Sequence, residues 1–277
     1  MTTALVTGAA SGIGRAIAAA LVARGDHVVL ADVDAAGAER AALDLGAGSV
    51  GSARSAALDV TDREAFGAVV KDVVAESGRL DVLVNNAGIG VGGLVEEMTP
   101  EHWDRAFEVN VRGVVHGIQA AYPVMVGQRG GHIVNTGSVA GLLPAPLMVP
   151  YSAGKHAVVG LSRALRLEAA AHGVGVTALC PGFVATPLLD DVNPALPETD
   201  ANRQAPRYVQ RMQGRMATPE EVAAACLRGI ERNRAVVVVP RAARLAVLGE
   251  RLAPRLVAAV SRAEIARYRA ERRRRAS

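Results

Sequence analysis

The chain has 277 residues, of which half are hydrophobic and 21% are charged, and its formal net charge is +4. This length and composition exclude a disordered chain and allow one large α/β domain or two small ones. Cys180 and Cys226 are the only cysteines, so we expect no disulfide framework, no bound metal and a reducing, cytoplasmic location. The first basic residue is Arg15, and we therefore expect no secretory signal, which opens with a charged segment.

Short apolar runs alternate with helical patterns through residues 1–240. Strands are expected at 4–7, at 27–31, up to Asp59-Val60, and at 80–84, 130–137, 173–180 and 235–240. This alternation predicts a doubly wound, Rossmann-type parallel sheet of seven strands with right-handed crossovers, in a single domain. Two helix starts have capping-box spacing, Thr61 with Glu64 and Thr218 with Glu221. One long helix is expected from Thr99, and another from Tyr151 to about 172.

A glycine turn follows the first strand, with Gly8, Gly12 and Gly14 in G-x-x-x-G-x-G spacing. Between a strand and a helix, such glycines permit a sharp bend and let the backbone approach a pyrophosphate at the helix N-terminus. The spacing differs from the usual G-x-G-x-x-G dinucleotide pattern. The turn therefore indicates dinucleotide binding, and a glycine turn without a ligand is the alternative.

Asp32 stands at the carboxyl end of the second expected strand. A carboxylate there accepts hydrogen bonds from ribose hydroxyls and repels a 2′-phosphate, which favours NAD over NADP. Two features leave the alternatives open. The segment opens a helix, so Asp32 or Asp34 is a candidate cap, and Arg15 is a cation that partly compensates a phosphate.

Tyr151 and Lys155 are four residues apart and share one face of a helix. An ammonium close to a phenol favours the phenolate, so we expect the pKa of Tyr151 to be lowered toward the range useful for a general acid or base. Ser138 precedes them in the same strand-loop-helix passage. An ordinary pair at a helix start is the alternative for Tyr151 and Lys155 alone.

Together these residues resemble the compact type of short-chain dehydrogenase/reductase, over roughly residues 3–240. The resemblance implies a catalytic tetrad of Asn110, Ser138, Tyr151 and Lys155, with the last two in the Tyr-x-x-x-Lys pattern. It implies that Tyr151 exchanges the hydroxyl proton and Ser138 holds the substrate oxygen. Lys155 is then expected to bind the nicotinamide ribose and lower the tyrosine pKa, and Asn110 to anchor a water molecule.

The resemblance also implies a nicotinamide-dinucleotide site, with NAD expected and NADP as the less favoured cofactor. Its adenine pocket is expected at Asp59 and Val60, and the "NNAG" turn lies at 85–88. The residues expected to bind the cofactor are Gly8, Ser11, Gly12, Ile13, Gly14, Asp32, Asp59, Val60, Asn86, Ala87, Gly88, Tyr151, Lys155, Pro181, Gly182, Val184 and Thr186.

The expected activity is hydride transfer between NAD and a secondary alcohol or ketone. The segment 139–150 is strongly apolar, and the segments 88–94 and 187–189 are expected beside the same cleft, so a lipophilic substrate is expected. Loops that pack on a lid, expected at about 188–216, or on a partner subunit are the alternative. Other candidates are an NADPH-dependent ketone or 3-oxoacyl reductase, a non-catalytic dinucleotide sensor, and an epimerase or dehydratase.

Residues 241–277 lie beyond the family pattern and form a basic extension. Residues 228–277 hold 14 arginines and 4 glutamates. Two amphipathic helices divided near Pro254 are expected, with Leu245, Leu248, Leu252, Leu256 and Val260 at helical spacing. Packing on the body or in an oligomer and peripheral membrane contact are the two main interpretations. Nucleic-acid binding is not expected, because aromatic residues do not alternate with the arginines. The resemblance implies a homodimer or homotetramer.

Overall fold

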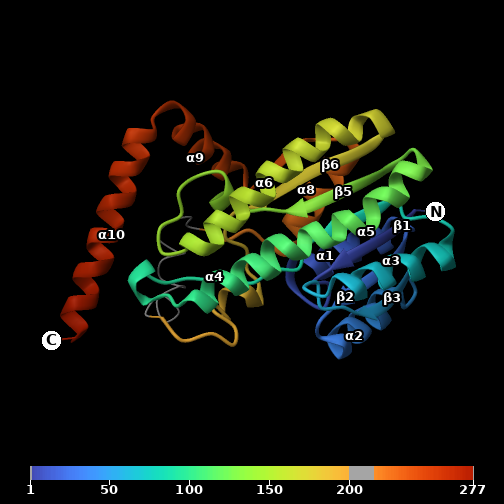
Figure 1. The fold of residues 1–277 in the computed structure, drawn as a ribbon, viewed down its shortest axis with the longest axis horizontal. Coiled ribbons are helices and arrows are strands. Elements are labelled where there is room, and N and C mark those ends of the chain that lie inside the picture. Colours follow the sequence, from blue (N-terminus) through green and yellow to red (C-terminus); the bar gives the residue numbers. More distant parts are fainter. Residues whose placement is uncertain (1, 200–214, 277) are drawn as a thin grey trace.

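Seven parallel strands form one sheet in the computed structural model, which describes residues 2–199 and 215–276. Their order is β3-β2-β1-β4-β5-β6-β7, so the chain builds one side of the sheet and then the other (Figure 1). The strands are β1 (Thr3–Thr7), β2 (His27–Asp32), β3 (Ser52–Ala57), β4 (Val82–Asn85), β5 (Gly131–Thr136), β6 (Val174–Pro181) and β7 (Val236–Val239). The predicted doubly wound, Rossmann-type sheet is confirmed.

Helices cover both faces of this sheet (Figure 1). On one face, Val6 of β1 packs with Ile17 and Val222, and on the other its neighbour Leu5 packs in the cluster that contains Phe66. Burial on both faces explains why the strands are unbroken apolar runs. The helices are α1 (Gly12–Ala23), α2 (Ala35–Gly46), α3 (Arg63–Ser77), α4 (Pro100–Phe107), α5 (Gly113–Gln128), α6 (Val149–Ala169), α8 (Pro219–Glu231), α9 (Arg241–Leu252) and α10 (Pro254–Ala276).

The functional site lies where the strand order of the sheet reverses, between β1 and β4. These strands are neighbours, but α1 leaves β1 on one face and α5 follows β4 on the other. In doubly wound sheets a crevice opens at this point, beyond the carboxyl ends of the strands. Thr7 and Asn85 are the last residues of the two strands and therefore border the crevice.

The third strand is shorter than predicted, because Asp59 and Val60 lie outside it. β3 ends at Ala57, which is the register partner of Asp32. Beyond this point the Asp59 carboxylate accepts hydrogen bonds from the backbone amide of Thr61, at 2.9 Å, and from its hydroxyl, at 2.8 Å. This local turn takes the chain away from the sheet.

The same turn explains why the predicted capping box at Thr61 and Glu64 is wrong. The Thr61 hydroxyl is engaged with Asp59, and Asp62 is the residue that caps α3, accepting from the amides of Glu64 and Ala65. The box at the start of α8 is confirmed. There the Thr218 hydroxyl accepts from the amide of Glu221, whose carboxylate accepts from the amide of Thr218.

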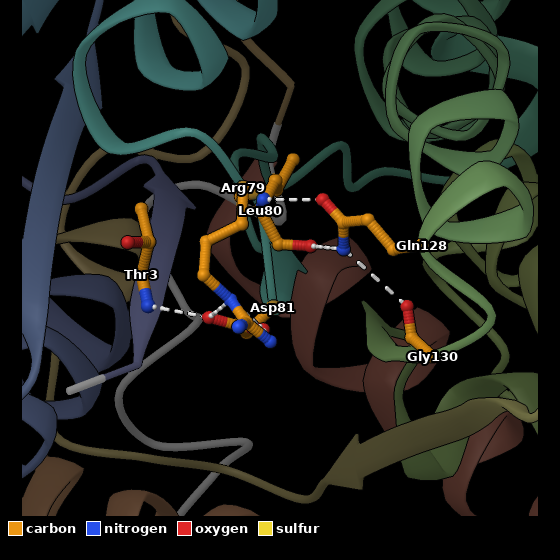
Figure 2. Close-up of polar contacts among 6 residues, drawn as sticks. All are labelled: Thr3, Arg79, Leu80, Asp81, Gln128 and Gly130. Carbon is orange, nitrogen blue, oxygen red and sulfur yellow. Dashed lines mark hydrogen bonds and ion pairs between the residues drawn. The ribbon is translucent and has the colours of Figure 1, made fainter.

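Polar contacts connect the amino ends of neighbouring strands (Figure 2). These ends lie opposite the carboxyl ends that border the crevice. Asp81 accepts a hydrogen bond from the backbone amide of Thr3, at 2.8 Å, and pairs with Arg79. The Gln128 side chain accepts from the Leu80 amide, at 2.8 Å, and donates to the Leu80 carbonyl, at 2.9 Å. These contacts join the start of β4 to β1 and to the end of α5.

His132 on β5 is expected to make the fold sensitive to acid. Its side chain is buried with Nε2 2.8 Å from Thr177 Oγ1, and burial, with the charge of Arg166, lowers its pKa from 6.5 to about 4. As the pH falls, the unfolded chain takes up a proton near pH 6.5 that the folded chain accepts only near pH 4. The free energy of unfolding should therefore fall by up to about 3 kcal/mol over this interval.

Urea unfolding at several pH values measures this effect, with His132→Gln as the test variant and exposed His156→Gln as the control. His132→Gln should lose this part of the pH dependence, and the control should keep it. Equal slopes in all three proteins would contradict the assignment.

The C-terminal extension consists of two helices, as predicted, with the division at Pro254. In Figure 1, α10 lies at the end of the molecule opposite β2 and β3. Tyr268 and Ile265 of α10 pack against Leu94 and Leu147, two residues of the body. No helix of the described residues is long and apolar enough to span a membrane.

Ion pairs hold the same half of α10 against the body. Arg269 lies 2.7 Å from Glu96, and Arg272 lies 2.7 Å from Glu97. The division of the chain at residue 240 stays a prediction. The predicted lid at 188–216 lies in large part, at 200–214, outside the described residues.

Candidate active site

The glycine turn after β1 forms a close backbone approach at the crevice. Gly8 and Gly12 have φ values of +64° and +53°, which favour glycine. A Cβ on Gly14 would meet the carbonyl of Gly8 and lie 2.7 Å from Asn86 Nδ2. The Ser11 side chain, just before α1, accepts no hydrogen bond from the first backbone amides of this helix, which therefore keep their capacity to bind an anion. This cradle fits the pyrophosphate of a dinucleotide.

Replacing Gly14 by alanine is expected to weaken NADH binding by at least about tenfold, because the new Cβ displaces the turn from the pyrophosphate position. Gly67→Ala on α3 is the matched control, since nothing lies within 4 Å of its Cβ position. The control should bind NADH normally and be more stable by about 0.5–1 kcal/mol. Fluorescence titration with NADH measures the difference, and equal affinities in the two variants would contradict the cradle.

Asp32 lines a cavity of about 320 Å³ beside this turn. Its carboxylate accepts hydrogen bonds from the amides of Ala10, at 2.9 Å, and Asp34, at 3.0 Å. The cap of α2 is Asp34, which accepts from the amide of Gly37 at 2.9 Å. Asp32 is therefore not the helix cap, and its carboxylate is fixed at the cavity wall.

The "NNAG" turn and Thr186 pack against the glycine turn. Asn86 Nδ2 donates to the carbonyls of Thr7, at 3.1 Å, and Gly8, at 3.3 Å. Thr7 Oγ1 accepts from the amides of Asn86 and Ala87. A Cβ on Gly12 would lie 3.2 Å from Thr186 Cγ2. Segments far apart in the sequence thus meet at the carboxyl ends of β1, β4 and β6.

The two residues predicted for the adenine pocket lie in the turn between β3 and α3, and their role there stays a prediction. The backbone amide of Thr61 donates a hydrogen bond to the Asp59 carboxylate, and this bond lowers the pKa of Asp59. Val60 is buried against Gly113 of α5. Pro181, Gly182 and Val184 lie at and just beyond the end of β6, and the Gly182 amide donates to the carbonyl of Val239 at 2.6 Å.

Ser138, Tyr151 and Lys155 converge above β5 and β6. The Lys155 side chain is buried, with Nζ donating to the Thr136 carbonyl at 2.8 Å and lying 5.6 Å from the centroid of the Tyr151 ring. Ser138 Oγ donates a hydrogen bond to the Pro181 carbonyl at 3.3 Å, accepts one from the Ala140 amide at 3.1 Å, and lies near enough to the Tyr151 hydroxyl to lower the pKa of that group. α6 begins at Val149, two residues before Tyr151, so the expected shared helix face is confirmed.

The expected direction of the Tyr151 pKa shift is wrong in this structure. Burial raises the pKa of Tyr151 above its ordinary value and outweighs the lowering effect of the nearby Ser138 hydroxyl. Burial also lowers the pKa of Lys155 from 10.5 to about 8, so the ammonium is itself disfavoured. The phenol is thus held in its protonated, proton-donating form near neutral pH.

Asn110 lies in a π-helical segment, Glu108–Arg112, between α4 and α5, so the expected single helix is interrupted here. Its Oδ1 accepts from the Ile89 amide and its Nδ2 donates to the Ile89 carbonyl, both at 3.0 Å. A Cβ on Gly88 would lie 2.7 Å from Asn110 Oδ1 and 3.5 Å from Lys155 Nζ. The Asn110 side chain therefore fixes the loop after β4 beside Lys155.

Sequence reasoning missed Cys180, which lies behind the tetrad on β6. Its thiol is fully buried, and burial raises its pKa to about 12. It lies near Lys155 and Tyr151, and a Cβ on Gly137 would lie 3.3 Å from its Sγ. The sequence shows only a lone cysteine in an apolar strand, which does not distinguish it from an ordinary core residue.

Three loops expected near the substrate lie against one another. Gly90 forms a bridge with Val192, and a Cβ on Gly90 would lie 3.3 Å from a methyl carbon of Leu188. The Gly93 amide donates to the Leu147 carbonyl at 2.8 Å. The loops after β4, β5 and β6 therefore form one connected surface next to the tetrad.

Comparison with known proteins gives the class of the chain. The family model for short chain dehydrogenases matches residues 2–197. The chain belongs to the short-chain dehydrogenase family, and it is an NAD(P)-dependent oxidoreductase with a nicotinamide dinucleotide as cofactor.

The similar proteins agree with this class. The chain is 37% identical to the 3-oxoacyl-[acyl-carrier-protein] reductase FabG of Thermotoga maritima, over 79% of this chain and 86% of that protein. It is 37% identical to the probable oxidoreductase EphD of Mycobacterium tuberculosis, over 83% of this chain but only 40% of that protein. A Burkholderia phymatum short chain dehydrogenase/reductase in complex with NAD has a TM-score of 0.83 and 35% identity, over 92% of this chain and 94% of that chain.

Proposed function

We propose that this oxidoreductase interconverts a lipophilic secondary alcohol and its ketone with NAD as the cofactor. The observation that carries the proposal is the group formed by buried Ser138 and Lys155 and half-buried Tyr151, beside a glycine turn that fits a dinucleotide. The loop 139–150 contains no charged residue, which supports an apolar substrate.

Each side chain has a separate task in the proposed reaction. The dinucleotide, when bound, supplies or takes the hydride. Ser138 Oγ holds the substrate oxygen, and the Tyr151 hydroxyl gives it a proton in reduction or accepts one in oxidation. Lys155 binds the nicotinamide ribose, and its positive charge stabilises the phenolate when that form is present. Asn110 anchors a water molecule for proton relay, and its two hydrogen bonds to Ile89 hold the loop after β4 beside Lys155.

The choice of NAD rests on the charge of Asp32. Its carboxylate faces the cavity where the adenine-side ribose is expected, and it repels a 2′-phosphate. Arg15 and Arg40 line the same cavity and favour the opposite choice. Both arginines have acidic neighbours, because Arg15 lies 3.3 Å from Asp44 and Arg40 lies 3.9 Å from Asp34.

A paired titration with NADH and NADPH tests this choice. We expect a Kd for NADH at least about tenfold below that for NADPH. Asp32→Asn should reduce this ratio, and Asp72→Asn, at an exposed position of α3, should leave it unchanged. Tighter binding of NADPH to the unmodified protein would overturn the proposal.

An NADPH-dependent reductase of ketones or 3-oxoacyl groups is the second candidate. One observation favours it: the similarity to FabG proteins, which are 3-oxoacyl-[acyl-carrier-protein] reductases. A screen of alcohols and ketones with the preferred cofactor separates the candidates. Small polar alcohols that are turned over more efficiently than hydrophobic ones would exclude a lipophilic substrate.

The assembly and location of the protein are also proposals. The resemblance to short-chain dehydrogenases implies a homodimer or homotetramer, and we expect one built on the helices that carry Asn110 and Tyr151. Size-exclusion chromatography with light scattering tests the assembly. We expect a cytoplasmic location, as the two buried free cysteines suggest.

A further inference from the structure

The bend between α9 and α10 exposes an apolar stripe. Five of the thirteen exposed large hydrophobic side chains of the described residues lie here, with exposed fractions from 50% to 75%. Those on α9 are spaced three and four residues apart and those on α10 four apart, so each set shares one helix face. The stripe consists of Leu245, Leu248, Leu252, Leu256 and Val260.

Exposed arginines accompany this stripe. There are five such arginines in α9 and α10, and none of the five forms an ion pair with another of the described residues. Glu250 is the only acidic residue between positions 241 and 263. The five arginines are Arg241, Arg244, Arg251, Arg255 and Arg262. The surface around the bend is thus both apolar and strongly basic.

The body of the protein holds this surface outward. Val247 is buried, unlike its neighbours Leu245 and Leu248, so α9 already has an inner face distinct from the stripe. At the other end, Tyr268 packs with Leu94 and Leu147, and Arg269 pairs with Glu96. Because these contacts fix α10 against the body, the stripe stays in solvent.

We propose that the bend of α9 and α10 docks on a lipid bilayer that contains anionic lipids. Helices whose exposed apolar face is bordered by arginines lie in the interface of such a bilayer, where apolar burial and attraction to lipid phosphates act together. The stripe supplies the apolar face, and the five arginines supply the charge.

Charge argues against a second copy of the chain as the occupant. In a two-fold symmetric dimer the same patch meets itself, so the five arginines of one copy would face those of the other with only Glu250 to compensate. An anionic bilayer satisfies both the apolar and the basic side chains.

Vesicle flotation of the full-length protein tests the proposal. We expect the protein to float with vesicles of phosphatidylcholine and phosphatidylglycerol, and to stay in the soluble fraction with phosphatidylcholine alone or at high salt. Leu252→Gln with Leu256→Gln should lower the partition coefficient by more than about tenfold. Leu43→Gln, at a leucine that is 69% exposed on α2, is the matched control and should bind normally.

A second pair of variants tests the electrostatic part. Arg251→Gln with Arg255→Gln should lower the partition coefficient by about 30-fold, whereas Arg63→Gln on α3 should have no effect. Absence of flotation with anionic vesicles would overturn the proposal, and so would equal flotation of the leucine double variant and the unmodified protein. Light scattering identifies the other occupant: an oligomer that dissociates in the leucine double variant, without vesicle binding, would assign the stripe to a second copy.

Discussion

Replacing Tyr151 by phenylalanine is expected to lower kcat by about 10²- to 10⁴-fold and to leave NADH binding unchanged. The Tyr151 hydroxyl, near Ser138, is the proton donor in the proposed reaction, and phenylalanine lacks it. The ring itself stays beside Lys155, so the shape of the crevice is kept. Steady-state kinetics with the substrate found in the screen, together with NADH titration, measures both quantities.

Tyr122→Phe is the matched control for this experiment. Tyr122 lies on α5, where its ring contacts His172 at a centroid distance of 6.4 Å, and it should keep full activity. If the Tyr151 variant turned over substrate as fast as the unmodified protein, Tyr151 would not be the acid. If neither the unmodified protein nor the variant turned over any substrate while both bound NADH, a dinucleotide-sensing role would be favoured.

Replacing Lys155 by methionine is expected to remove activity and to stabilise the fold. The ammonium is buried and its pKa is lowered to about 8, so holding it charged at neutral pH costs folding free energy. Methionine fills a similar volume without this cost, and the lost hydrogen bond to Thr136 offsets part of the gain. A net stabilisation of about 1–2 kcal/mol is expected at pH 7.

The pH dependence of this gain has a definite sign. Because the folded pKa lies below the unfolded one, the cost in the unmodified protein is complete below about pH 8 and disappears as the pH rises to about 10.5. Urea unfolding should thus show the advantage of Lys155→Met at pH 7 and not near pH 10.5. Lys71→Met, at the only other lysine of the chain and an exposed position, should show no such change. If Lys155→Met kept its turnover and pH profile, the proposed mechanism would be wrong.

Features that depend on neighbours in the chain were predictable from the sequence. The strand, glycine turn and helix from Thr3 to Ala23, the capping box at Thr218, and the shared face of Tyr151 and Lys155 all follow from local spacing. The carboxyl ends of parallel strands meet at one edge, so the gathering of Asp32, Asn86 and Ser138 also followed once the sheet was expected.

Other features came from contacts between distant segments. The two hydrogen bonds of Asn110 to Ile89 and the position of Cys180 behind Lys155 have no local pattern. The predicted capping box at Thr61 is wrong because the Thr61 hydroxyl donates a hydrogen bond to Asp59. The spacing of Thr61 and Glu64 is nevertheless the same as that of the confirmed box at Thr218 and Glu221. Spacing alone therefore does not decide a helix cap where a neighbouring carboxylate competes for the same hydroxyl, and the adenine-pocket role of Asp59 stays a prediction.

The order of apolar and glycine residues was enough to specify the sheet and the crevice, because strand burial and backbone turns depend on residues close in sequence. The protonation of Tyr151 and the docking of α10 required the folded chain. A pKa depends on how far each group is withdrawn from water, and helix docking depends on side chains such as Leu94 and Tyr268 that are far apart in sequence.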